Sequence, residues 1–133
     1  MNAELENKLY KDHPLIFADK DKSMSESLMI FGCECGDGWY NIIEALCQSI
    51  DNWYENECRN NKGNPPAPVV AAQIKEKFGS LKFYTTGHCD EVQGMITMAE
   101  NLSAMTCEQC GRPGTSRGNG LLYTACSQCA GKS

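Results

Sequence analysis

The chain has 133 residues, of which 41% are hydrophobic and 22% charged, as in an ordinary globular protein that can bury a core of its own. Its formal net charge of −5 disfavours general binding to the nucleic-acid backbone, and no stretch approaches the roughly 18 consecutive apolar residues of a membrane helix. The first residues lack the basic and apolar regions of a secretory signal, so we expect a cytoplasmic protein.

The first predicted element is a short helix over residues 3–11, in which two leucines lie four residues apart on one face. Pro14 ends this helix, because the residue before a proline avoids helical backbone angles. We therefore expect His13 at the surface, in a turn. Residues 18–27 are almost entirely polar and are predicted to form an exposed loop.

The strongest periodic pattern predicts a long helix over residues 38–59, with Asp37 as its N-cap. Nine apolar residues recur at helical spacing and form one broad face, which includes Trp39, Cys47 and Cys58. The residues of the opposite face are Glu44, Gln48, Asp51 and Glu55. We expect this face to be solvated; the alternative is that it docks a basic partner or mimics nucleic-acid phosphate.

A proline-rich connector at residues 65–68 precedes two strand-like runs, Val69 to Ile74 and Leu81 to Thr86, with a turn region between them. Together they predict a hairpin over residues 69–86. Asp90 is then expected to cap a helix over residues 91–105. The predicted fold class is α+β, with helices packed on a short antiparallel β-hairpin. We expect residues 1–105 to form one domain and residues 106–133 a zinc ribbon packed on it.

Two Cys-x-x-Cys pairs, separated by fifteen residues, carry the clearest chemical signal: Cys107, Cys110, Cys126 and Cys129. Two intervening residues let the chain curl so that both sulfurs of a pair reach one ion, and Gly111 suits the tight turn. Four thiolates leave no open coordination position, so the predicted zinc ion is structural and not catalytic. The alternatives are two redox-active pairs or four independent buried thiols.

Five further cysteines lie outside this pattern. Cys47 and Cys58 are predicted to be small buried hydrophobic residues on the long helix. Cys33, Cys35 and Cys89, with His88, offer enough ligands for a second zinc ion if they meet in space. One intervening residue is an unusual spacing for a zinc chelate, so we do not expect this second site. A redox switch at Cys33 and Cys35 is a further alternative.

The sequence shows no recognisable acid–base constellation, phosphate-binding loop or nucleophile elbow. We therefore predict no catalytic residue and no cofactor-binding residue, and expect a protein that is not an enzyme. A pairing of a cysteine with a histidine stays open as an alternative, because neighbours in space need not be neighbours in sequence.

Four segments give the chain a resemblance to a family of small zinc-ribbon-containing accessory proteins of bacteriophages and prophages. These segments are Cys35 to Tyr40, Ile42 to Cys47, Gln73 to Tyr84 and Ala99 to Gly114. In many members the last metal position resembles a histidine, whereas Cys129 stands there in this chain. The resemblance implies a phage-encoded protein in the bacterial host cytoplasm. It implies no particular activity and no catalytic residue.

Three functions follow from these observations. The first is a protein that binds a host protein and modulates or inhibits it, as anti-CRISPR proteins do with a host defence system; this step is an analogy. The second is a zinc-dependent nucleic-acid-binding regulator, with Arg112, Arg117 and Lys132 on phosphate. The third is a thiol redox sensor or enzyme that uses Cys33, Cys35 or Cys89.

Overall fold

The computed structural model describes residues 1–87 and 89–131. Its elements in chain order are α1 (Ala3–Asp12), η1 (Leu28–Phe31), β1 (Cys33–Glu34), η2 (Asp37–Trp39), α2 (Tyr40–Asn60), β2 (Val70–Lys77), β3 (Ser80–Thr86), α3 (Asp90–Ser103), β4 (Thr115–Arg117) and β5 (Tyr123–Ala125), where η denotes a short 3₁₀ helix. The predicted α+β class, with helices on an antiparallel hairpin and a cysteine-rich C-terminal segment, is confirmed.

One three-stranded sheet, in the order β1-β2-β3, supports the helices. The predicted hairpin is the antiparallel pair β2–β3, but β2 continues to Lys77, through residues that we expected to lie in the turn. Lys77 pairs with Ser80, so the turn consists of Phe78 and Gly79 alone. Both have a positive φ, which suits a two-residue turn between strands with a right-handed twist. β1 joins β2 in parallel and was not predicted, because two residues show no periodicity.

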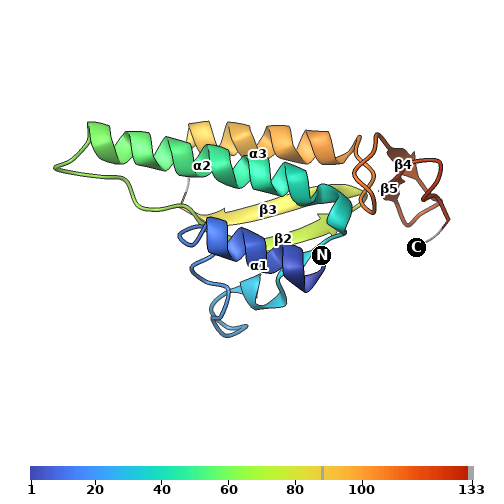
Figure 1. Cartoon of the computed structure of the whole chain (residues 1–133), viewed down its shortest axis with the longest axis horizontal. Helices are drawn as coiled ribbons and strands as arrows, with labels where there is room; N and C mark the ends of the chain where they lie inside the picture. Colours follow the sequence, from blue (N-terminus) through green and yellow to red (C-terminus); the bar gives the residue numbers. More distant parts are fainter. Residues whose placement is uncertain (88, 132–133) are drawn as a thin grey trace.

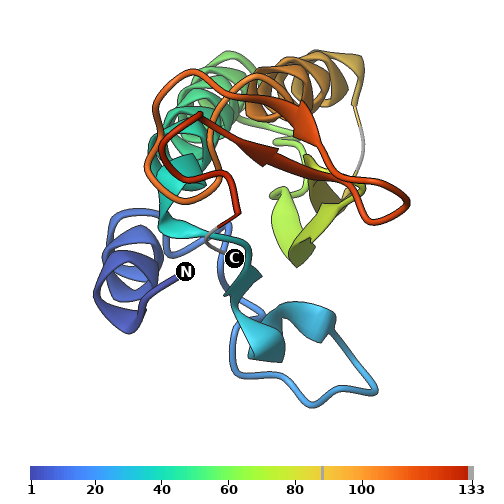
Figure 2. The ribbon, with the colours of Figure 1, turned by 90° about the vertical axis from the view of Figure 1, so that its right-hand side faces the viewer.

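α2 and α3 lie side by side over one face of the sheet (Figures 1 and 2). The core that they share with the sheet and the N-terminal segment holds nineteen buried hydrophobic residues, Trp39 among them. The outer edge of β3 lies against α3: the amide of Leu81 donates to Ser103 Oγ at 2.7 Å and the amide of Phe83 donates to Glu100 Oε2 at 3.2 Å. This core places the start of α2, the end of α3 and the β2–β3 turn at the same end of the molecule (Figure 1).

Two predicted helix caps are wrong. Asp37 does not cap α2, because a 3₁₀ turn precedes the helix; its carboxylate instead accepts hydrogen bonds from the backbone and side-chain nitrogens of Asn2, at 2.8 and 2.9 Å. Asp90 is the first residue of α3 and not its cap. The cap is Cys89, whose sulfur accepts a hydrogen bond from the amide of Val92 at 3.5 Å.

His13 is buried, with 1% of its surface exposed, so the predicted surface position is wrong. Its Nδ1 lies 2.6 Å from Asp51 Oδ2, and its Nε2 lies 2.8 Å from Glu44 Oε2. The two carboxylates are seven residues apart, two turns of α2, and so project from the same side of the helix. Part of the acidic face that we expected to be solvated is therefore half-buried, and it holds the segment after α1 against α2.

Candidate metal centre

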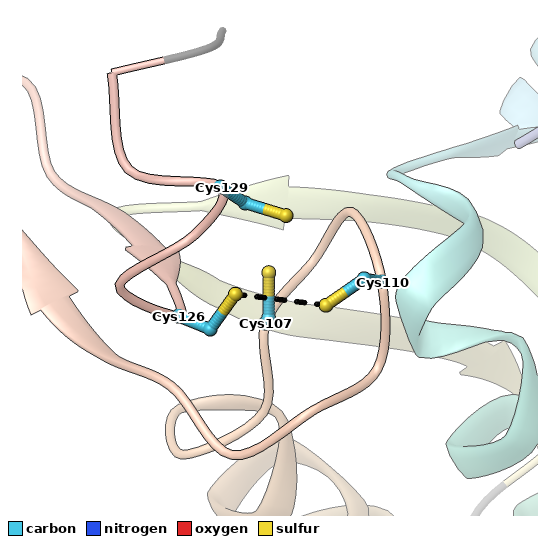
Figure 3. A group of neighbouring side chains, drawn as sticks. All are labelled: Cys107, Cys110, Cys126 and Cys129. Carbon is cyan, nitrogen blue, oxygen red and sulfur yellow. Dashed lines mark hydrogen bonds between the residues drawn. The ribbon is translucent and has the colours of Figure 1, made fainter.

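The C-terminal segment brings together the sulfurs of Cys107, Cys110, Cys126 and Cys129, all within 4.8 Å of one another. Figure 3 shows the four side chains pointing toward one common space. Cys107 follows α3 and is fully buried, and Cys126 follows β5 with 8% of its surface exposed. Cys110 is exposed and Cys129 half-buried. The two pairs that lie far apart in the sequence therefore form one cluster that can hold a metal ion.

The spacing of the sulfurs suits a tetrahedral thiolate site. With zinc–sulfur bonds of about 2.3 Å, neighbouring sulfurs of a tetrahedron lie about 3.8 Å apart. The sulfurs of Cys110 and Cys126 lie 3.7 Å apart (Figure 3). Disulfide-bonded sulfurs would be about 2.05 Å apart, and all four cysteines are free thiols. The alternative of two disulfide-forming redox pairs thus has no support in this geometry.

The backbone within each Cys-x-x-Cys pair directs amide hydrogens toward the sulfurs, and a glycine turn follows each pair. Gly111 and Gly131 both have φ near +81°, which a glycine adopts without strain. Burial by itself would raise the pKa of Cys107, but hydrogen bonds from the amides of Cys126, Cys110 and Gln109 outweigh it and lower the pKa to about 6. The amide of Cys129 similarly lowers the pKa of Cys126. Hydrogen bonds therefore favour the thiolate, the form that binds metal, at Cys107 and Cys126. At Cys129 the hydrogen bond with the Cys126 side chain acts in the opposite direction and raises the pKa to about 12.

A two-stranded ribbon positions the second pair. β4 and β5 are antiparallel, and Arg117 pairs with Tyr123 across the ribbon. β5 begins at Tyr123, and Leu121 and Leu122 lie exposed in the preceding loop. β4 was not predicted, since three polar residues flanked by glycines show no strand pattern.

The loop before α2 lies directly against the first cysteine pair. The amide of Gly38 donates to the carbonyl of Glu108 at 2.7 Å, and the amide of Gly36 donates to the Glu108 carboxylate at 2.9 Å. Trp39 Nε1 donates to the carbonyl of Thr106 at 2.9 Å. Sequence reasoning missed this role of Glu108; the only available signal was the pair of glycines around Asp37.

The division of the chain into two domains between residues 105 and 106 stays a prediction.

Replacement of Gly38 by alanine should disturb this contact. A Cβ at Gly38 would clash with the carbonyl oxygen of Cys107 and lie 2.6 Å from the backbone nitrogen of Gly111, and neither backbone atom can move away cheaply. We expect Gly38→Ala to lower the free energy of unfolding by about 2 kcal/mol and to weaken metal binding. Urea denaturation and competition with a metal chelator measure the two effects.

Gly94 provides the matched control. It lies within α3, and a Cβ there would meet nothing within 4 Å. Gly94→Ala should therefore stabilise the protein by about 1 kcal/mol through helix propensity and leave metal affinity unchanged. Equal effects of the two substitutions would contradict the packing described for Gly38.

The remaining cysteines do not add to the cluster. Cys33, in β1, and Cys35, directly after it, are both buried, and burial raises the pKa of both thiols, that of Cys35 to about 12. Cys47 is fully buried, as predicted, whereas Cys58 is half-buried. His88 lies outside the described residues, so the expectation about a second site at Cys33, Cys35, His88 and Cys89 stays a prediction. Within the described ranges, the four C-terminal cysteines form the one group of potential metal ligands found.

Comparisons with protein-family models, with curated proteins and with solved structures found no match to this chain. The functional interpretation therefore rests on the site itself. None of the helices described, the 21-residue α2 included, combines the length and apolar character that crossing a bilayer requires.

Proposed function

We propose that Cys107, Cys110, Cys126 and Cys129 hold one structural Zn²⁺ ion. Four cysteine sulfurs within 4.8 Å of one another are the donor set of structural zinc sites, and amide hydrogen bonds to the sulfurs are typical of such sites. The ion would supply no chemistry beyond cross-linking the two pairs. All four coordination positions would be taken by the chain, so no position would be left for a water molecule or a substrate.

We further propose that the protein acts by binding another protein and altering or blocking its activity. The observation that carries this proposal is the closed ligand set, which makes the metal centre a scaffold and not a reaction site. The resemblance to accessory proteins of bacteriophages and prophages supports a host protein as the target, and a defence system, as for anti-CRISPR proteins, is one such target. That step rests on analogy.

The two alternative functions have less support. For nucleic-acid binding, Arg112 already contacts Gln128, and Arg117 donates to the carbonyl of Ala125 at 2.9 Å. Lys132 lies outside the described residues. For a thiol sensor, the raised pKa values of Cys33 and Cys35 leave a very small thiolate fraction at neutral pH, and the thiolate is the reactive form.

Metal analysis of protein that has never met a chelator tests the first proposal. We expect one equivalent of zinc per chain, and a Co²⁺-substituted protein should show the absorption of a tetrahedral thiolate complex. Well under one equivalent of any metal would contradict it.

Chemical cross-linking in a bacterial host tests the second proposal. It should join the protein to a stoichiometric protein partner, and the cross-linked complex should survive nuclease treatment. A nuclease-sensitive complex, or none, would contradict it.

A further inference from the structure

The β2–β3 turn carries an exposed aromatic ring, Phe78, and Lys77 Nζ lies over this ring, 5.7 Å from its centroid. Phe78 has a φ of 54° and 72% of its surface exposed. A bulky side chain in this left-handed region is strained, and an exposed ring regains little of that cost through burial. Asn-Gly is the sequence that such a turn favours, whereas Phe78-Gly79 stands here. A strained and exposed aromatic residue is expected where another molecule contacts it.

The turn is held in place from both sides. The amide of Gly79 donates to Glu76 Oε2 at 2.7 Å, and the carbonyl of Gly79 accepts a hydrogen bond from the hydroxyl of Thr124 in β5. The carbonyl of Thr124 in turn accepts from the amide of Glu108, next to Cys107, at 3.1 Å. The metal-bearing segment therefore holds the backbone of the turn from which the Phe78 side chain projects. A turn that is already ordered loses little backbone entropy on binding.

Three lysines share the outer face of the hairpin beside this ring. Lys75 lies directly opposite Lys82, and Lys77 follows two residues after Lys75 on the same face. Lys75 and Lys77 form no ion pair within the described part of the chain, and Lys82 Nζ lies 4.0 Å from Glu100 Oε1. Like charges placed directly opposite each other destabilise a hairpin, so the pair of Lys75 and Lys82 does not stabilise this one. These lysines are also positive charges on a chain whose net charge is negative.

A cavity of about 670 Å³ runs along β3 beside α3 and joins these features. Lys77, Phe78, Lys82 and Tyr84 line it, with Gln93, Ile96 and Glu100 from α3. Tyr84 and Phe78 are both exposed, so the cavity has aromatic walls beside two cationic groups. This combination suits an apolar side chain flanked by carboxylates.

We propose that this cavity, together with Lys75, is the docking surface for an acidic segment of another protein. An apolar side chain of that segment would lie between Phe78 and Tyr84, and its carboxylates would meet Lys75, Lys77 and Lys82. The inference rests on the proposed protein-binding function and names the surface and the chemistry of the partner. A protein segment fits better than a nucleic acid. The net charge of −5 repels the many phosphates of a nucleic acid, whereas an acidic segment carries only a few carboxylates, which the lysines can pair with.

A displayed library of random peptides, selected on the zinc-loaded full chain, tests this surface. We expect the selected peptides to share acidic residues around an apolar one, and their affinity to fall as salt rises. Phe78→Asn should weaken the best peptide at least tenfold and at the same time raise the melting temperature, because asparagine tolerates the left-handed turn. A protein that only loses structure would not show these opposite changes.

Two further variants complete the test. The double substitution Lys77→Glu with Lys82→Glu should weaken the same peptide at least tenfold. Met24 is 63% exposed and belongs to the loop before η1. That loop lies away from the β2–β3 turn in both views (Figures 1 and 2). Met24→Asn is therefore the control and should leave peptide binding unchanged.

Three results would overturn the inference: a selection without an acidic consensus, equal peptide binding by Phe78→Asn, or displacement of the peptide by single-stranded oligothymidylate, which would assign the surface to nucleic acid. The cross-linking experiment distinguishes a wrong docking surface from a wrong protein-binding function. If Phe78→Asn keeps the cross-linked protein partner, the protein-binding function stands and the docking surface lies elsewhere.

Discussion

Replacement of Cys107 by serine is expected to release the proposed zinc ion and to unfold the C-terminal segment while the rest of the protein stays folded. The physical reason is the size of the two hydrophobic clusters. The main core has nineteen buried hydrophobic residues, whereas the cluster at the metal centre has only three, two of them proposed ligands. Such a small cluster cannot hold a ribbon together, and structural zinc contributes about 10–16 kcal/mol in comparable peptides.

The measurements are metal content and hydrogen exchange. We expect Cys107→Ser to weaken zinc binding by at least about a thousandfold. The amides of Glu108, Gly111 and Gly114, which are hydrogen-bonded in the structure, should then exchange freely. Amides in α2 and β2 should stay protected. Removal of zinc from the unaltered protein with a chelator should give the same exchange pattern.

Cys58→Ser is the matched control, since Cys58 is a half-buried thiol of α2, away from the metal cluster. This variant should bind one equivalent of zinc and keep the protection of the C-terminal amides. A Cys107→Ser protein that retained both properties would show that the segment folds without a four-thiolate site.

Replacement of His13 by alanine is the second change with a large expected effect. Both ring nitrogens lie within hydrogen-bond distance of carboxylate oxygens, and only the doubly protonated ring has a hydrogen for each. Without this cation, Glu44 and Asp51 would face a cavity as two unpaired, partly buried negative charges. We expect the free energy of unfolding at pH 6 to fall by about 3 kcal/mol, as measured by urea denaturation.

Glu55→Gln is the control, because Glu55 is exposed on the same helix and should change stability by less than about 0.5 kcal/mol. Equal stabilities of the His13→Ala and unaltered proteins at pH 6 would mean that the ring does not link α2 to the segment after α1.

The same contacts predict how stability depends on pH. Burial would lower the pKa of His13, but the hydrogen bonds and charges of Asp51 and Glu44 outweigh it, so the pKa is raised above about 6.5. The stabilisation is therefore complete below about pH 6.5 and is lost as the pH rises through the raised value. The difference in unfolding free energy between unaltered protein and His13→Gln should shrink with rising pH. Both proteins are measured at saturating zinc, so that the contribution of metal binding to stability is the same in each and cancels in the difference. A constant difference would contradict a charged His13.

Most of what could be predicted from the sequence came from the periodicity of hydrophobic residues and the spacing of cysteines. α2 has a long apolar face, and the two cysteine pairs have a spacing that one ion explains, so both could be inferred without a structure. The contacts of His13 could not, because they depend on how the segment after α1 folds back onto α2, and no local pattern records that. The same holds for Glu108, which accepts hydrogen bonds from two glycines that lie 72 and 70 residues earlier, Gly36 and Gly38.

The turn at Phe78 shows a different limit. Strand periodicity ended the predicted strand at Ile74, since the lysines after it looked like turn residues, yet the pairing continues to Lys77. A Phe-Gly turn gives no signal of its own, because phenylalanine is not a residue that left-handed turns favour.

The hydrogen bonds between α3 and the margin of β3 also bear on how copies of the protein behave when concentrated. A strand at the border of a sheet usually offers its amides to any extended chain that approaches, and this is how fibrils grow and how domains swap. Here Ser103 and Glu100 already accept the amides of Leu81 and Phe83. An incoming chain would have to displace both acceptors before it could pair, so the helix that packs the core also disfavours self-association through this border.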